Sequence, residues 1–274
     1  MRFSARRRPA SVSRSTFAGF RFPAEVITVA VRWYLRYGLS YRDIEELLAE
    51  RGVDVDHVTV YSWVQRFTPL FADAARFARH APGDRWFVDE TYVKVNGVWR
   101  YVYRAVDQYG QVVDVLVSAR RDANAARRFF RRALDTLKVT PSEVVTDRAP
   151  TYPRVLDELI PAAWHHVERY ENNRIEADHG RLKHRLRPMR GLRTEQTAQV
   201  VVAGLAFVQN LRSGHYELAT ESPASASSRH GVHRARPGDL TQGAMSIGLP
   251  ADPRPQQRRV GPTIVSVHPP PQWN

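Results

Sequence analysis

The chain contains no cysteine, so it forms neither disulfide bonds nor thiolate metal sites. It also lacks a long hydrophobic run: its most apolar stretch, residues 200–208, is far shorter than the roughly 20 residues that span a bilayer. The basic amino terminus has no continuous apolar segment of the kind found in signal peptides. These absences favour a soluble, cytoplasmic protein.

Acidic residues are scarce relative to basic ones. The chain has 28 Asp and Glu against 41 Lys and Arg, which gives a formal net charge of +13 and a pI near 10.5. A charge of this size indicates a polyanionic partner, either nucleic acid or an anionic membrane, although a merely soluble basic protein would have it too.

The two ends of the chain differ in composition from its middle. The first 22 residues include six Arg and no acid, and we expect a mobile basic arm over residues 1–21. Residues 217–274 hold nine of the 18 prolines without sustained apolar periodicity, which predicts a disordered tail over residues 216–274. The folded part is expected between these segments.

Residues 22–70 have the pattern of three short helices. Gly38 and Gly52 end the first two helices, Ser40 and Asp43 form a capping box, and Asp56 caps the third helix. The three apolar stripes are Ile27, Ala30, Val31 and Tyr34; Tyr41, Ile44, Leu47 and Leu48; and Val60, Trp63, Val64 and Phe67.

The third helix also has a polar face that could donate hydrogen bonds to phosphates and base edges. Its residues are His57, Thr59, Ser62, Gln65 and Arg66. Three short helices of this kind are typical of a helix-turn-helix DNA-binding domain. Any small helical bundle with a solvated face would fit the same pattern.

Residues 80–215 change to an α/β pattern. Two strands, 85–95 and 98–107, flank the hairpin turn Asn96-Gly97, and a third strand follows over residues 111–118. After them we expect a helix over 122–137, a strand over 143–146, a helix after Pro150, a strand over 164–167, and helices beginning near Asn173 and Thr194. This order predicts an RNase H-like domain, a mixed five-stranded sheet with helices, preceded by the all-α module.

Three acids fall where this fold would bring them together. Asp89 lies inside the first strand among large apolar residues, Asp147 directly follows the fourth strand, and Glu176 lies on the first turn of the helix that begins at Asn173. If the first and fourth strands are neighbours, the two aspartates are adjacent, and the helix can present Glu176 across them. A lone acid is usually a surface charge, and Asp147 alone could cap a helix, but an unpaired carboxylate inside an apolar strand is costly.

Clustered carboxylates repel one another unless a cation neutralises them. Oxygen ligands without Cys or a dense His cluster suit Mg²⁺, with Mn²⁺ able to substitute. Two such ions, about 3.5–4 Å apart, can activate the attacking oxygen and stabilise the leaving oxygen of a phosphodiester. The sequence therefore predicts a catalytic and metal-binding triad of Asp89, Asp147 and Glu176.

The helix that holds Glu176 continues into a basic stretch. Residues 181–193 contain five Arg, one Lys, one His and no acid, and we take Arg181, Lys183 and Arg185 as DNA-binding candidates. Asp178 is two residues from Glu176 and should point elsewhere on the helix, so we interpret it as a structural or supporting acid.

At these residues the chain resembles the DDE-type transposases of bacterial insertion sequences, specifically the insertion-sequence-six family. The matching stretches are VRWYLRYGLSYRDIEELLAERGVDVDHVTVYSWVQRF, DETYVKVNGVWRYVYRAVD, TDRAPTY and NNRIEADHGRLKHRLRPMRGL. The resemblance implies that Asp89, Asp147 and Glu176 are the metal-binding triad and that Lys183 lies near the DNA end. It also implies strand transfer by a bacterial, nucleoid-associated protein that binds double-stranded DNA, both the terminal inverted repeats and the target, as a homo-oligomer.

Two features depart from that family pattern. Glu176 follows Asp147 by 29 positions, a few fewer than expected, which indicates a shortened loop, and the tail after Tyr216 has no recognised counterpart. Two other interpretations stay open: a metal-dependent nuclease without strand transfer, and a DNA-binding regulator or transposase remnant without catalytic activity.

Overall fold

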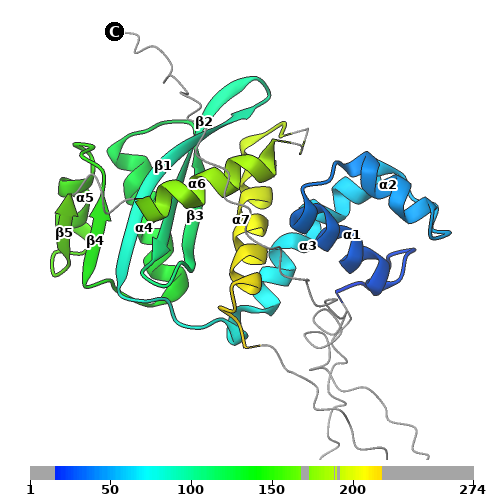
Figure 1. The fold of residues 1–274 in the computed structure, drawn as a ribbon, viewed down its shortest axis with the longest axis horizontal. Helices are drawn as coiled ribbons and strands as arrows, with labels where there is room; N and C mark the ends of the chain where they lie inside the picture. Colours follow the sequence, from blue (N-terminus) through cyan, green and yellow to red (C-terminus); the bar gives the residue numbers. More distant parts are fainter. Residues whose placement is uncertain (1–15, 168–172, 188, 190–191, 218–274) are drawn as a thin grey trace, which may run out of the picture.

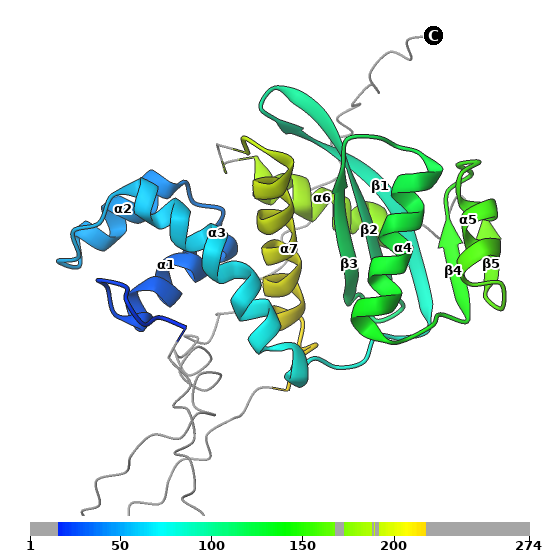
Figure 2. The same cartoon turned by 180° about the vertical axis from the view of Figure 1, so that it is seen from behind.

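A computed structural model describes residues 16–167, 173–187, 189 and 192–217. A three-helix part lies beside an α/β part, in which helices cover both faces of one sheet (Figures 1 and 2). The helices are α1 (Ala24–Tyr37), α2 (Tyr41–Ala49), α3 (His57–Ala74), α4 (Ala123–Leu137), α5 (Tyr152–Leu159), α6 (Asn173–Leu186) and α7 (Glu195–Arg212), with a 3₁₀ turn η1 (Arg76–Ala78) after α3. The strands are β1 (Arg85–Val95), β2 (Val98–Asp107), β3 (Val112–Ser118), β4 (Glu143–Thr146) and β5 (Trp164–Val167).

The sheet has the order β3-β2-β1-β4-β5. The first three strands are antiparallel, whereas β4 runs parallel to both β1 and β5. The turn between β1 and β2 has positive φ angles at both Asn96 and Gly97, 48° and 78°, as a type I′ hairpin requires. The structure thus confirms the RNase H-like strand order.

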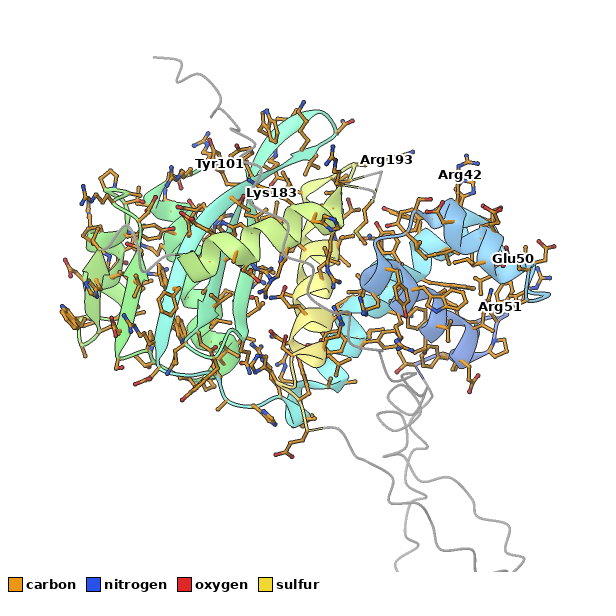
Figure 3. All side chains as sticks on the ribbon, viewed as in Figure 1. Arg42, Glu50, Arg51, Tyr101, Lys183 and Arg193 are labelled. Carbon is orange, nitrogen blue, oxygen red and sulfur yellow. The ribbon has the colours of Figure 1, made fainter. Side chains whose placement is uncertain are left out.

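The caps expected in the three-helix part are present. Gly38 ends α1 in the left-handed conformation, with φ of 67°, and Ser40 and Asp43 form both hydrogen bonds of the capping box. One oxygen of Asp56 accepts hydrogen bonds from the amides of Val58 and Thr59 at the start of α3. Exposed charged side chains, among them Arg42, Glu50 and Arg51, cover the outer end of this part (Figure 3).

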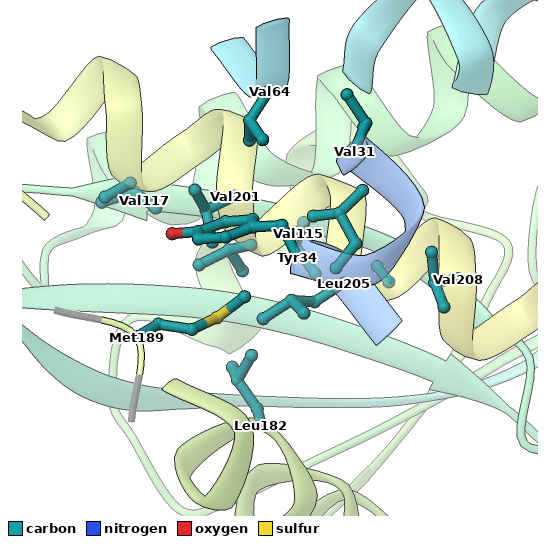
Figure 4. Close-up of a cluster of buried hydrophobic side chains, with 14 of the residues drawn as sticks. Val31, Tyr34, Val64, Val115, Val117, Leu182, Met189, Val201, Leu205 and Val208 are labelled. Atoms are coloured by element: carbon teal, nitrogen blue, oxygen red, sulfur yellow. The ribbon is translucent and has the colours of Figure 1, made fainter. Parts of the chain in front are cut away.

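The helix α3 continues to Ala74, seven residues beyond the Phe67 that ended its expected stripe. This extension lies against α7, which in turn packs on β3. One hydrophobic cluster therefore joins the three-helix part to the α6 and α7 side of the sheet, with Val31 and Val64 on one side of α7 and Val115 and Val117 on the other (Figure 4). A second cluster fills the opposite face of the sheet, beneath α4 and α5.

A close helix contact in the shared cluster occurs at Gly204 of α7. A methyl group there would lie 2.5 Å from the Thr68 methyl and 2.8 Å from a methyl carbon of Leu35. We expect Gly204→Ala to lower the free energy of unfolding by about 1–3 kcal/mol, because the added carbon overpacks the interface. The exposed Gly180 of α6 has open space around its Cα, so Gly180→Ala should raise stability by up to about 1 kcal/mol.

Thermal unfolding of the two variants tests this contact: the melting temperature should fall for Gly204→Ala and rise for Gly180→Ala. Equal stabilisation by both substitutions would contradict the close packing of α7 on α1 and α3.

The expected arm and tail lie largely outside the described residues. The tail is described only up to Glu217, and the arm only from Thr16. In that short part of the arm, Phe17 and Phe20 contact Phe67, with ring centroids 4.9 and 5.0 Å apart. None of the helices in the described part of the chain is both long and apolar enough to cross a lipid bilayer.

Candidate active site

The parallel pairing of β1 with β4 brings Asp89 and Asp147 together. The last paired residues are Val88 and Thr146, so each aspartate is the next residue on its chain. β4 ends there, and the edge of β1 is left open beside Asp147. The adjacency expected from the strand order is therefore present.

Each aspartate has one oxygen held by a nearby backbone amide. Asp89 Oδ1 accepts a hydrogen bond from the amide of Glu90 at 2.7 Å, and Asp147 Oδ1 accepts one from the amide of Ala149 at 3.0 Å. These bonds orient the carboxylates and leave each Oδ2 for other partners.

A third acid, Glu90, completes the group. One carboxylate oxygen each from Asp89, Glu90 and Asp147 lie within 4.8 Å of one another, which is close enough to hold a metal ion. Sequence reasoning missed Glu90, although the cost of an unpaired carboxylate in an apolar strand applies to it as much as to Asp89. Because side chains alternate along a strand, Glu90 points to the α4 and α5 side, where Tyr152 is buried, while Asp89 points toward α6.

Arg121, just before α4, bridges two of these acids. Its Nη2 lies 2.9 Å from Asp147 Oδ2 and 3.2 Å from Glu90 Oε2. The Glu90 side chain is only 1% exposed, whereas Asp147 is 36% exposed. Arg121 therefore neutralises the buried acid and fixes the more accessible one. No sequence signal pointed to it, because only the fold brings this loop to the sheet edge.

The electrostatics of the group favour a bound cation. The pKa of Asp89 is raised to about 7, chiefly by burial; the hydrogen bond from the Glu90 amide opposes this rise, and the charges of Glu90 and Asp147 add to it. Burial also raises the pKa of Glu90, despite the opposing charge of Arg121. Both carboxyls thus bind protons more tightly than usual, because burial and neighbouring negative charges disfavour their ionised forms.

The helix α6 lies against β1 beside Asp89. His179 Nδ1 is 3.7 Å from Asp89 Oδ2, and Lys183 Nζ, one turn further on, lies 4.5 Å from the centroid of the Tyr92 ring. Burial lowers the pKa of His179 to about 4, helped by the charge of Arg104, so its imidazole is neutral at pH 7.

Glu176 lies one turn before His179 on α6, and its side chain is exposed. In the part of the chain that the structure describes, it is not a member of the close group of acids.

Asp178 has a structural role, as expected. It is 3% exposed and forms an ion pair with the buried Arg104 of β2, while Gln209 of α7 donates a second hydrogen bond to it. Burial alone would raise the pKa of Asp178, but the charge and hydrogen bond of Arg104 outweigh it and lower the pKa. This pair ties α6 to the sheet and so fixes the turn that bears Glu176.

The predicted polar face of α3 is partly engaged within the protein. Ser62 and Arg66 are exposed, and Arg66 lies over the Phe20 ring at 5.3 Å. His57, Thr59 and Gln65 are half-buried: the His57 ring lies 2.9 Å from a Glu45 oxygen, and the Thr59 hydroxyl donates to Asp56.

The basic candidates on α6 also differ in their surroundings. Arg181 and Lys183 are exposed. Arg185 is half-buried, and its Nη1 donates to the carbonyl oxygens of Leu35 and Arg36 at the end of α1, at 3.2 and 3.3 Å. Arg185 therefore links α6 to the three-helix part.

Comparison with known proteins agrees with this arrangement. A family model described as a DDE domain matches residues 83–215. The transposase for insertion sequence-like element IS431mec of Staphylococcus aureus is 41% identical over 168 residues, which cover 60% of this chain and 75% of that protein. The transposase for insertion sequence element IS257 in transposon Tn4003, also from Staphylococcus aureus, is 40% identical with the same coverage.

Among solved structures, the HTLV-2 integrase catalytic core domain in complex with magnesium matches with a TM-score of 0.33 and 20% identity, over 38% of this chain and 69% of that one.

An RNase H-like sheet with acids at the adjoining positions of β1 and β4 defines an enzyme of the polynucleotidyl transferase class. Within that class, the chain belongs to the insertion-sequence-six family of DDE transposases.

Proposed function

We propose that Asp89, Asp147 and Glu176 hold two Mg²⁺ ions at which this transposase cuts the ends of its element and joins them to target DNA. The observation that supports this most strongly is the parallel pairing of β1 and β4, which brings a buried Asp89 and the more accessible Asp147 into one group of carboxylates.

The residues present fit a divalent metal. Carboxylate oxygens of Asp89, Glu90 and Asp147 lie within 4.8 Å of one another, and hard cations such as Mg²⁺ or Mn²⁺ prefer such oxygen ligands. The raised pKa of Asp89 indicates that a cation would relieve an unfavourable charge. When bound, such ions lower the pKa of an attacking water or hydroxyl and stabilise the leaving oxygen.

The protein's own residues orient the site. Backbone amides hold Asp89 and Asp147, Arg121 holds the outer oxygen of Asp147, and the neutral His179 packs beside Asp89 without adding a competing charge. Glu176 lies one turn before His179 on α6, the helix that packs beside Asp89, and it is the acid of this helix that we assign to the metal site.

The DNA contacts are assigned by charge and fold. The three-helix part, residues 22–70, acts as a helix-turn-helix domain that binds the terminal inverted repeats, and residues 80–215 form the catalytic domain that also meets the target DNA. The net charge of +13 suits a double-stranded polyanion. Two element ends must be held together, so the protein works as a homo-oligomer, on DNA in the bacterial cytoplasm and nucleoid.

A strand-transfer assay with a labelled element end and a plasmid target tests the proposal. Joined products should form with Mg²⁺ or Mn²⁺ and disappear with EDTA. Cleavage without joining would identify a nuclease instead, and metal-independent DNA binding with neither reaction would identify a regulator or an inactive remnant.

Arg66→Ala in the full-length chain should weaken binding to element-end DNA and reduce the slope of log K against log salt by about 1, because one phosphate contact is lost. Gel-shift titrations at several salt concentrations measure both quantities. Arg76→Ala is the matched control, since Arg76 lies in η1 just after α3 and is 57% exposed but pairs with Asp73. An unchanged slope for Arg66→Ala would contradict its role in the DNA interface.

A further inference from the structure

An open groove with a cavity volume of about 740 Å³ lies between the β1–β2 hairpin and the end of α6. Among the residues that the structure describes, its lining is mainly aromatic, aliphatic and basic and includes no acid. Lys183 and Arg193 mark its two ends along α6 and the segment before α7 (Figure 3). The Asn96 amide donates to the Leu192 carbonyl at 2.8 Å, which holds the hairpin turn against that segment.

Two aromatic rings form one wall of the groove. Tyr92 and Trp99 meet edge to face, with ring centroids 5.0 Å apart, and Trp99 is 46% exposed. Lys94 Nζ lies 5.0 Å from the Trp99 centroid, and Lys183 lies over Tyr92. A half-exposed Trp99 beside Lys94, with Lys183 on the neighbouring Tyr92, is a stacking surface bordered by phosphate-binding groups.

The opposite side of the groove supplies more positive charge and an apolar floor. Arg187 and Arg193 are exposed, and Leu186, Met189 and Leu192 lie beneath them. Aromatic faces together with cations match the faces and phosphates of unpaired nucleotides. The bases of an intact duplex keep their faces stacked on each other, so they could not reach Trp99.

The groove adjoins the candidate active site. Tyr92 is three residues along β1 from Asp89, a distance of about 10 Å at the rise of a strand. Lys183 is one helical turn from His179, which contacts Asp89. A DNA strand that passes the acids therefore enters the groove within a nucleotide or two.

We propose that this groove binds one or two unpaired nucleotides of the DNA end next to the cut, with a base stacked on Trp99 and its phosphates held by Lys94, Arg187 and Arg193. The volume lies within the range of about 300–1,000 Å³ typical of ligand pockets, which leaves room for such a segment. This inference rests on the proposed function, because it takes the strand being cut as the ligand.

The test is a binding experiment without catalysis. Full-length protein in EDTA is titrated with two element-end duplexes of the same sequence, one frayed by mismatches at its last two positions and one closed by a covalent hairpin. Trp99→Ala should weaken binding of the frayed DNA about 5- to 150-fold, as for loss of one stacked base, and leave the closed DNA unchanged. Trp99→Phe should retain most of the affinity.

Trp164→Ala is the matched control, since Trp164 is 67% exposed on β5, away from the groove; it should bind both DNAs normally. A photo-crosslinking 5-iodouracil in the frayed segment should attach to Trp99 or Tyr92. Equal losses on frayed and closed DNA, or crosslinks only elsewhere, would overturn the proposal. So would a shift in sedimentation of DNA-free Trp99→Ala, because a second copy of the chain would then occupy the groove.

Because these measurements need no metal, they separate the two ideas. If Trp99→Ala weakens binding of the frayed DNA alone but the wild type shows no metal-dependent joining, the proposed function is contradicted and the groove proposal is supported. If joining occurs but Trp99→Ala binds frayed and closed DNA alike, only the groove proposal is contradicted.

Discussion

Asp89→Asn and Asp147→Asn should each reduce strand transfer more than about 100-fold while DNA binding stays near normal. Substituting groups that merely support a metal ligand already costs about 10–100-fold, so loss of a ligand should cost more. Glu176→Gln should have a similar effect. Initial rates of joining, measured with a labelled element end at saturating DNA, give these ratios.

The folding of the Asp89→Asn protein offers an internal control. Because the pKa of Asp89 is raised to about 7 from the usual value of 3.8, the folded state binds the proton more tightly than the unfolded state does. The metal-free protein therefore loses stability as pH rises between those two values, and the ionised carboxylate is unfavourable above them. The melting temperature of Asp89→Asn at pH 8 in EDTA should thus equal or exceed that of the wild type.

Asp135→Asn is the matched control for activity, since Asp135 is 82% exposed on α4 and makes only a long contact to Lys138. Strand transfer near the wild-type rate in Asp147→Asn would contradict the assignment of Asp147 to the active site.

Arg104→Ala and Asp178→Ala should each lower the free energy of unfolding by about 3–5 kcal/mol, because each leaves its partner charged and unpaired in the protein interior. The two side chains are 1% and 4% exposed, so solvent offers little compensation. For a domain of this size the melting temperature should fall by roughly 6–20 °C. Differential scanning calorimetry measures the change.

The two acids of α6, Asp178 and Glu176, should differ in their effect on the melting temperature. Asp178→Ala should destabilise the fold strongly, whereas Glu176→Gln should leave the melting temperature unchanged, because Glu176 is exposed. Replacing both members of the pair, as Arg104→Met with Asp178→Leu, should cost less than either single substitution. A melting temperature that is insensitive to Arg104→Ala would contradict the structural role.

Local sequence signals predicted the elements well. Asn96-Gly97 fixed the hairpin, so the bounds of β1 and β2 match the expected residues, and Ser40 and Asp56 marked the starts of α2 and α3 correctly. The apolar stripe of the third helix gave no end for it; α3 continues to Ala74, and helix α3 packs on α7.

The candidate site was predictable only in part. The proximity of Asp89 and Asp147 could be predicted from the strand order, because each follows the last paired residue of two neighbouring parallel strands. Glu90 was missed although it follows Asp89 directly, and Arg121 reaches the acids from a loop that no short-range pattern connects to them. The charge of Arg185 made it a DNA-binding candidate, but long-range packing directs its side chain to a carbonyl oxygen at the end of α1. Contacts between distant segments were therefore the part that sequence could not supply.

The most direct test of the central claim is a crystal structure of the full-length protein with Mn²⁺, measured with anomalous scattering at the manganese edge. We predict manganese peaks bounded by the carboxylates of Asp89, Asp147 and Glu176, with Glu90 still paired to Arg121. A peak enclosed by Asp89, Glu90 and Asp147 with Glu176 in solvent, or no peak beside Asp89, would contradict the assigned triad.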